Sequence, residues 1–199
     1  QKIKMIFLSS GGTVYGNQEI QPITEDALPR PINHYGNVKL CIENTIRTFN
    51  YQAHTKILIA RISNPYGPGQ DFNKGVGFID AALKKTIKEE KIEIWGDGNN
   101  VRDYIYIDDV CRMLISLFYY QEDYDTFNIS SNTGTSQRDV IRMLEAMQLA
   151  PQVEYLPERS VDAKKIILNN ERIMSIHAVP LVPVEQGIRK YYQWLKKEI

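Results

Sequence analysis

Apolar residues along the chain form short runs that alternate with longer amphipathic segments. The runs KIKMIFLSS (2–10) and KILIARIS (56–63) are typical of strands buried on both faces of a parallel sheet. Between them, a loop rich in proline and acidic residues extends through Pro31, and the segment 33–53 then has the periodicity of a long helix. The pattern predicts two parallel strands joined by a helical connection.

The rest of the chain continues this alternation with shorter elements. We expect helices at about 75–88 and 109–120, a helix N-capped by Ser136, and two further helical segments toward the C-terminus. Strands are expected near 92–95, near 103–107, at TFNIS (126–130) and at QVEYLP (152–157). This order favours an α/β fold with a parallel sheet. From about residue 65 onward the elements are more interrupted, which predicts a smaller lobe.

Composition narrows the class of protein. The 199 residues are 43% apolar and carry 24 basic and 24 acidic side chains, so no net charge favours binding to nucleic acid or to a membrane surface. Cys41 and Cys111 lie far apart, which predicts free thiols and a cytoplasmic protein. The three histidines are scattered, so no metal site is expected. No apolar run reaches the 18 residues of a membrane-spanning helix.

A tyrosine four residues before a lysine occurs twice. HYGNVK contains Tyr35 and Lys39, and YYQWLK contains Tyr192 and Lys196, so the spacing alone does not identify a site. The second pair lies in an amphipathic C-terminal helix with no strand end or hydroxyl-rich loop beside it. That context predicts a helix face that packs on one side and meets solvent on the other.

The first pair has different surroundings. Open parallel sheets bind ligands beyond the carboxyl ends of their strands, which here lead into SSGGTVYG (9–16) and SNPYGPGQ (63–70). The predicted long helix starts soon after the first of these loops, with Tyr35, Lys39 and Glu43 on neighbouring turns. We therefore expect the Tyr35–Lys39 pair to face the same crevice as the two loops.

This pair suits proton transfer coupled to hydride transfer. A tyrosine phenol has a pKa of about 10, and lowering it to about 7 requires roughly 4 kcal/mol. An ammonium group one helical turn away and the positive ring of an oxidised nicotinamide both favour the phenolate. Tyr35 is then a candidate base that removes a hydroxyl proton while hydride leaves the same carbon.

Four ordered motifs carry a resemblance to a known family. SSGGTVYG, YGNVK, RISNPYGPGQ and GDGNNVRDYIYIDDV resemble the extended short-chain dehydrogenase/reductase family, in particular its UDP-glucose 4-epimerase-like nucleotide-sugar epimerases and dehydratases, and the likeness extends to PERSVD (157–162). The resemblance implies a partial Rossmann-like parallel sheet in residues 1–65, with a smaller α/β substrate-binding lobe mainly in 66–199. It also implies NAD as cofactor, a nucleotide sugar of the UDP type as ligand, and a homodimer or higher oligomer in which the 33–53 helix forms half of a helix bundle.

The resemblance assigns roles to individual residues. It implies that Tyr35 is the catalytic base and that Lys39 assists it and holds the nicotinamide ribose, with Ile62 also in the cofactor site. The residues implied to contact the nucleotide sugar are Asn64, Val76, Arg102, Arg159 and Asp162, the asparagine and the arginines on the diphosphate. Without the resemblance, Arg102 and Arg159 would be read as surface ion-pair residues and Asn64 as an ordinary turn residue.

Two departures from the family pattern stand out. Gly11 occupies the position where the family usually has Ser or Thr, so we expect Ser10 or Thr13 to supply the substrate-binding hydroxyl, with Ser10 slightly favoured. The chain also has no G-x-x-G-x-x-G, and GGTVYG (11–16) leads into a polar loop rather than a helix, so it is no nucleotide fingerprint. We expect a truncated piece of a longer enzyme that starts at the fifth strand, is inactive alone and has no measurable affinity for NAD.

The loop chemistry favours one reaction within the family. Dehydratases carry Asp-Glu at the positions of Gly12 and Thr13, and decarboxylases carry Glu at the latter, whereas this loop offers hydroxyl groups and no carboxylate. The sequence therefore predicts a 4-epimerase that works through a 4-keto intermediate. A dehydratase or decarboxylase of the same family is the alternative, and so is a non-catalytic relative that binds a ligand. Retention of Tyr35, Lys39, Asn64 and the two arginines Arg102 and Arg159 argues against the non-catalytic relative.

Overall fold

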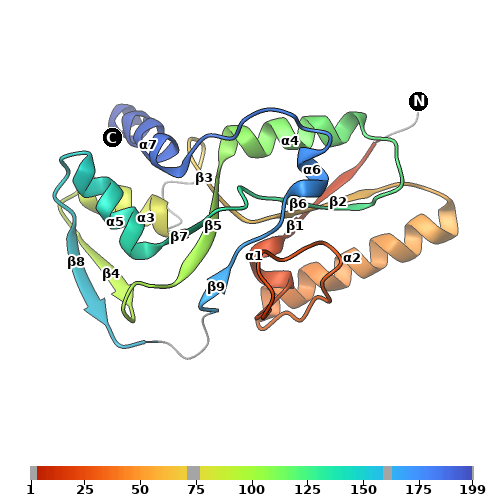
Figure 1. The fold of residues 1–199 in the computed structure, drawn as a ribbon, viewed down its shortest axis with the longest axis horizontal. Coiled ribbons are helices and arrows are strands. Elements are labelled where there is room, and N and C mark those ends of the chain that lie inside the picture. The colour runs from red at the N-terminus through yellow and green to blue at the C-terminus, as the bar shows by residue number, and fades with distance from the viewer. Residues whose placement is uncertain (1–3, 71–76, 159–162, 199) are drawn as a thin grey trace.

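The computed structural model describes residues 4–70, 77–158 and 163–198 (Figure 1). Its first sheet contains three parallel strands in the order β1–β2–β6, with β1 at Ile6–Ser10, β2 at Leu58–Ile62 and β6 at Thr126–Ile129. Ile6 pairs with Leu58, and Ser10 pairs with Ile62 at the carboxyl end. The predicted pairing of the two apolar runs is confirmed.

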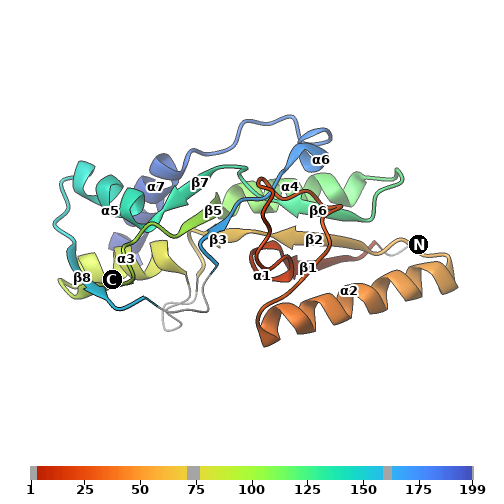
Figure 2. The ribbon, with the colours of Figure 1, turned by 60° about the horizontal axis from the view of Figure 1, so that its bottom comes forward.

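Two helices lie on opposite sides of this sheet. α2 (His34–Ala53) connects β1 to β2 and lies on one side, whereas α4 (Ile107–Tyr119) lies on the other (Figures 1 and 2). The apolar core of this part forms between α4 and the sheet, and includes Ala60, Met113 and Phe127. The layered arrangement of helix, parallel sheet and helix is that of a doubly wound α/β fold.

The remaining strands form a second lobe. β5 (Val101–Tyr106) pairs with β3 (Asn64–Tyr66) and β9 (Lys165–Ile166) in parallel and with β7 (Gly134–Ser136) in antiparallel orientation. β4 (Lys91–Trp95) and β8 (Gln152–Leu156) form a separate parallel pair. The second core lies among these strands and three helices: α3 (Phe78–Ile87), α5 (Gln137–Ala146) and α7 (Val184–Glu198). One short helix, α6 (Glu171–Met174), precedes α7.

Local sequence signals explain where the main helices start. Ser136 caps α5 as predicted, in a capping box that it forms with Asp139. The side chain of Asn33 caps α2 by accepting a hydrogen bond of 2.8 Å from the backbone N–H of Gly36. At its other end α2 stops at His54, whose φ of 50° is left-handed.

Two segments differ from the sequence-based expectation. The first four residues after β1 form a helical turn, α1 (Gly11–Val14), where we expected a loop. The residues after Ser63 do not turn at once but continue as β3, which leaves the first sheet and joins β5. Pro65 is compatible with this strand because β3 is at the edge of its sheet and pairs on one side only. β7 and β9 are too short for periodicity to predict.

The α/β fold class is confirmed: a partial Rossmann-like parallel sheet is followed by a smaller α/β lobe. The first lobe also receives β6 from far along the chain. Across the described ranges, none of the helices combines the length and apolar character that crossing a bilayer requires.

Candidate active site

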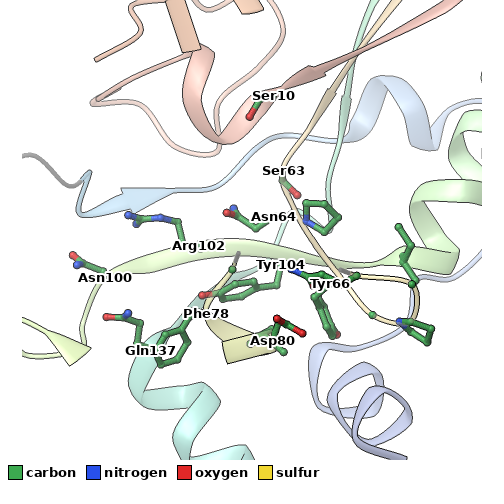
Figure 3. A pocket seen from close by; sticks show the side chains of 18 of the residues that line it. Ser10, Ser63, Asn64, Tyr66, Phe78, Asp80, Asn100, Arg102, Tyr104 and Gln137 are labelled. Carbon is green, nitrogen blue, oxygen red and sulfur yellow. The ribbon is translucent and has the colours of Figure 1, made fainter. Parts of the chain in front are cut away.

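A cavity of about 730 Å³ lies where the two lobes meet at the carboxyl ends of β1 and β2. Ser10 from the end of β1 and Tyr35 from the first turn of α2 lie on one side, and the segment 63–70 follows β2 along its wall. The other lobe contributes side chains that include Asp80, Trp95, Asn100, Arg102, Tyr104 and Gln137 (Figure 3). Segments far apart in the sequence therefore converge on one space large enough for a small-molecule ligand.

Tyr35 is held at this cavity by a close contact between two helices. Gly36 packs against the backbone of α1: a Cβ atom at that position would lie 2.6 Å from the carbonyl oxygen of Thr13. Only glycine allows that approach without displacing one of the two backbones. The Tyr35 side chain beside it is 57% exposed and borders the cavity, so a bound ligand could reach the phenol.

Lys39 is fixed one turn further along α2. Its Nζ donates a hydrogen bond of 2.9 Å to the carbonyl oxygen of Leu8 on β1. The same ammonium lies 5.6 Å from the centre of the Tyr35 ring and 5.0 Å from that of Phe7. A lysine ammonium has three donors, so this arrangement positions a cation beside the phenol and leaves it capacity to bind a ligand hydroxyl.

Asn64 and Arg102 also line the cavity and lie close to each other (Figure 3). β3 and β5 pair so that Asn64 lies opposite Tyr104, and the Asn64 amide donates a hydrogen bond of 3.2 Å to the carbonyl oxygen of Asp103. Arg102 precedes that residue on β5, and its guanidinium donates a 2.9 Å bond to the carbonyl oxygen of Val101. An amide and a forked cation thus lie close together, which suits a phosphate-bearing ligand.

The carboxylate of Asp103 is buried and binds donors from several segments of the chain, a role that the sequence alone did not predict. It accepts hydrogen bonds from the backbone N–H groups of Ser131, Asn132 and Leu168 and from the hydroxyls of Ser63 and Ser131, at 2.8–3.5 Å. Burial raises the pKa of Asp103 to about 6, and these hydrogen bonds partly offset that effect. The side chain ties the strand that carries Arg102 to the segments around it.

Other sequence-predicted residues lie near the cavity without lining it. The Oγ1 atom of Thr13 donates a 3.4 Å hydrogen bond to the carbonyl oxygen of Ser10. Of the two candidate hydroxyl residues, Ser10 lines the cavity and Thr13 does not. Ile62 pairs with Ser10 in the sheet and is partly buried in the first core. Val76, Arg159 and Asp162 lie outside the described residues, so their implied roles stay predictions.

The second tyrosine–lysine pair lies elsewhere. Tyr192 is on α7, packed against the core of the second lobe, and the Nζ of Lys196 lies 5.7 Å from its ring centre. The two pairs therefore share a spacing and a ring–ammonium contact but not a cavity. Tyr35 lines the cavity, with Lys39 one turn further along α2, whereas Tyr192 and Lys196 do not line it.

A buried ion pair lies between α2 and β2, one helical turn beyond Lys39. Glu43 on α2 and Arg61 on β2 are both fully buried, and the guanidinium donates to the carboxylate at 2.6, 3.1 and 3.2 Å. Burial would raise the pKa of Glu43, but the hydrogen bonds and charge of Arg61 outweigh it and hold that pKa below its usual value. The sequence signal was an arginine within an otherwise apolar strand.

No metal centre is visible: in the ranges 4–70, 77–158 and 163–198 no three His, Cys, Asp or Glu side chains are placed to hold an ion. The surroundings of Lys39 do suit part of a dinucleotide. A cation with donors to spare, a phenol and the Phe7 ring lie together beside β1, whose Leu8 side chain is half exposed. These groups fit a ribose hydroxyl and a flat ring such as nicotinamide.

The sequence of residues 1–130 matches the NAD dependent epimerase/dehydratase family. The chain belongs to this family. The resemblance to nucleotide-sugar epimerases and dehydratases of the extended short-chain dehydrogenase/reductase type is thereby confirmed. Residues 1–130 include β1, α2, β3 and β5, which carry Ser10, Tyr35, Lys39, Asn64 and Arg102.

Several similar proteins are enzymes whose names refer to sugar nucleotides. It is 33% identical to dTDP-4-dehydro-6-deoxyglucose reductase of Escherichia coli, over 94% of this chain and 60% of the relative. It is 30% identical to dTDP-L-rhamnose 4-epimerase of Burkholderia thailandensis, over 86% of this chain and 48% of the relative. Among solved structures, UDP-glucose 4-epimerase of Thermotoga maritima with UDP-glucose superposes with a TM-score of 0.91 and 30% identity, over 98% of this chain and 64% of that chain.

The coverage of these alignments is asymmetric. Nearly all of this chain aligns, yet it spans only 60%, 48% and 64% of the three proteins. The relatives also differ in reaction, one being a reductase and two being epimerases. Membership of the family follows from the comparisons, whereas the reaction and the substrate have to be argued from the site.

Proposed function

We propose that the full-length protein is an NAD-dependent nucleotide-sugar 4-epimerase that acts on a UDP-hexose. The observation that carries this proposal is that Ser10, Tyr35, Asn64 and Arg102 line one cavity. Groups suited to proton transfer and groups suited to binding a diphosphate thereby border one ligand-sized space, as a sugar linked to a nucleoside diphosphate requires.

The cofactor would occupy the side of the cavity formed by β1 and α2. Lys39 would hold a ribose hydroxyl with the donors that its bond to Leu8 leaves, and the Phe7 and Tyr35 rings flank that position. When bound there, NAD supplies a reversible acceptor for the hydride that leaves C4 of the sugar. Lys39 would also stabilise negative charge on Tyr35 through their proximity.

The residues of this chain would then perform the proton transfers. Tyr35 removes the proton from the 4-hydroxyl as hydride leaves the same carbon, and the product is a 4-keto sugar. Ser10, at the end of β1, donates a hydrogen bond to that oxygen in place of the missing hydroxyl at Gly11. Arg102 and Asn64 would keep the diphosphate bound while the keto sugar rotates, and Tyr35 would then return the proton to the sugar oxygen.

The positions of the carboxylates favour epimerisation over elimination. Gly12 packs beside Asn64, with the site of its absent Cβ 3.7 Å from the amide nitrogen, and Thr13 carries a hydroxyl. Asp80 is the one carboxylate among the described lining residues, and it is bonded to Tyr191 and, at 2.8 Å, to Lys84. It lies across the cavity from Ser10 (Figure 3). Dehydration needs an acid and a base beside the sugar, and no described residue supplies that pair.

The test is a product assay on the full-length protein supplied with NAD and UDP-glucose. We expect conversion to UDP-galactose up to a fixed ratio of the two sugars, the same ratio from either starting sugar, and no net reduction of NAD. Formation of a 4-keto-6-deoxy sugar nucleotide would overturn the assignment in favour of a dehydratase, and stoichiometric production of NADH would overturn it in favour of a dehydrogenase.

A further inference from the structure

The helix that carries Tyr35 and Lys39 is attached to the sheet in an unusual way. α2 has 20 residues, yet Gly36 and Glu43 are its only fully buried ones. No α2 residue belongs to any of the three apolar clusters found among the described residues. Helices normally rest on a sheet through an apolar stripe, whereas within this chain the contacts that join α2 to β1 and β2 include several hydrogen bonds and an ion pair.

Polar contacts take the place of that stripe along the length of α2. At the start, Gly36 contacts the backbone of Thr13, and one turn on Lys39 binds the Leu8 carbonyl. At the end, the Asn50 amide exchanges two hydrogen bonds of 2.9 Å with the backbone of Ile57. Between these points, Glu43 forms the one contact that reaches both strands.

Glu43 connects three elements at once. Its carboxylate accepts a 2.5 Å hydrogen bond from the hydroxyl of Ser9 on β1 and the forked bonds of Arg61 on β2. Arg47, one turn further along α2, adds a bond of 3.1 Å. The Arg61 guanidinium also lies 4.7 Å from the centre of the Tyr15 ring, so that ring packs against the same cation that binds Glu43.

Each of the three elements carries a residue of the proposed site nearby. Ser9 precedes Ser10, Glu43 follows Lys39 by one turn, and Arg61 precedes Asn64 by three residues. A forked ion pair has a defined geometry, unlike apolar contacts, which tolerate sliding and rotation. Removing its charges would leave α2 free to shift relative to β1 and β2.

We infer that the buried Glu43–Arg61 pair is a positioning device, which fixes the rotation and height of α2 so that Tyr35 and Lys39 meet the ligand bound beside Ser10. This inference rests on the proposed function for its kinetic consequence. The geometric consequence, a displaced Tyr35, does not depend on which reaction the protein catalyses.

The decisive variant replaces both partners with apolar side chains of similar length, Glu43→Met/Arg61→Met. Buried ion pairs replaced in this way often leave the protein folded, because no unpaired charge remains inside. Asp109→Leu/Arg112→Met is the matched control, since that pair joins α4 to the segment around Val182 and lies outside the cavity. Glu43→Asp tests geometry alone, because it keeps the charge and shortens its reach by one methylene.

Two measurements on the full-length protein are needed. The first separates kcat from KM for epimerisation, after unfolding curves have shown that each variant is folded. The second needs neither NAD nor substrate. It compares the NMR chemical shift of the Tyr35 ring between variants, in protein labelled with carbon-13 at tyrosine Cζ. The Tyr35 signal is identified by its loss in Tyr35→Phe. The signals of Tyr66 and Tyr191, buried in the other lobe, serve as internal references.

In Glu43→Met/Arg61→Met we expect kcat to fall about 10- to 100-fold, since small misplacements of reacting groups have effects of that size, with KM within about twofold. The Tyr35 signal should move while the reference signals stay in place. Glu43→Asp should lie between this variant and the wild type, and Asp109→Leu/Arg112→Met should keep the wild-type kcat.

Three outcomes would count against the inference or its basis. An unshifted Tyr35 signal with unchanged kcat in a folded Glu43→Met/Arg61→Met would overturn it. Equal losses of kcat in this variant and in the Asp109→Leu/Arg112→Met control would also overturn it, because they would show a general effect of lost stability. A shifted Tyr35 signal in a protein whose wild type does not epimerise UDP-sugars would instead refute the proposed function and leave the positioning role standing.

Discussion

The Nζ of Lys39 donates a hydrogen bond of 2.9 Å to the carbonyl oxygen of Leu8, and this bond ties the second turn of α2 to the strand that leads into Ser10. The lysine therefore keeps a fixed position between a backbone carbonyl and the ring of Tyr35, 5.6 Å away. A lysine held in this way stays beside the Tyr35 ring without first being ordered by a ligand, which lowers the entropic cost of assembling the proposed site.

Tyr35→Phe in the full-length protein should lower epimerase turnover by about two to four orders of magnitude, the usual effect of losing a general acid/base. Affinity for the nucleotide sugar should change little, because Asn64 and Arg102, not Tyr35, are the cavity-lining residues proposed to hold the diphosphate. Turnover and affinity are measured separately, by product analysis and by calorimetry. Tyr192→Phe is the control with the same spacing to a lysine and should match the wild type; near-normal turnover of Tyr35→Phe would remove this residue from the mechanism.

Arg102→Ala should weaken binding of UDP-glucose by about 1.5–3 kcal/mol, the contribution of a hydrogen bond to a charged group. A nucleoside monophosphate should lose less, because it lacks one of the phosphates that the guanidinium would bridge. Titration calorimetry on the full-length protein measures both ligands. Arg142→Ala removes an exposed arginine of α5 outside the cavity and should have no effect; if both variants bind like the wild type, Arg102 does not hold the diphosphate.

Asp103 should contribute more to the free energy of unfolding at acid pH than at neutral pH. Burial raises its pKa from 3.8 to about 6, so the folded protein binds the proton more tightly than the unfolded chain. The stabilisation is fully present below about pH 4 and is lost as the pH rises through about 6, a difference on the order of 3 kcal/mol. The deficit in unfolding free energy caused by Asp103→Asn should therefore be larger at pH 4 than at pH 7, as measured by denaturant titration.

The control for this measurement is an aspartate whose pKa is lowered instead of raised. Asp97 lies in the bend between β4 and β5, where hydrogen bonds from the backbone and side chain of Asn99 lower its pKa. Its contribution is present at neutral pH and is lost as the pH falls, so the deficit caused by Asp97→Asn should shrink toward acid. A deficit for Asp103→Asn that also shrinks toward acid would show that the hydrogen bonds to this carboxylate outweigh its burial.

The outer face of α2 should mediate self-association. Val38, Ile42 and Phe49 are exposed at intervals that place them along one side of the helix, and exposed apolar stripes mark interaction surfaces. Light scattering on the full-length protein should show a dimer or a higher oligomer, and Ile42→Glu should shift it toward monomer. Tyr119→Glu, which adds the same charge at an exposed position on α4, should not; a monodisperse wild-type monomer would refute this assembly.

The candidate site shows how far residue patterns alone can reach. Hydrophobic runs located β1, β2 and α2 within a few residues, because strands and helices of that length are set by local periodicity. The rule that ligands bind beyond strand ends also predicts that Ser10, Tyr35 and Asn64 border one crevice. The same reasoning distinguished the Tyr35 pair from the Tyr192 pair by context.

Tertiary structure decided the features that depend on contacts between distant segments, which local periodicity does not predict. The continuation of β2 into β3 depends on pairing with β5, whose partner residues come about 40 positions later, and no local signal for it exists at Pro65. The roles of Asp103 and Arg61 likewise depend on which donors and acceptors the fold brings around them. Local patterns determine which segments become strands and helices because those contacts lie within a few residues. Which charged side chains end up buried and paired is decided by long-range packing, because a buried charge is tolerated only where distant segments supply its partners.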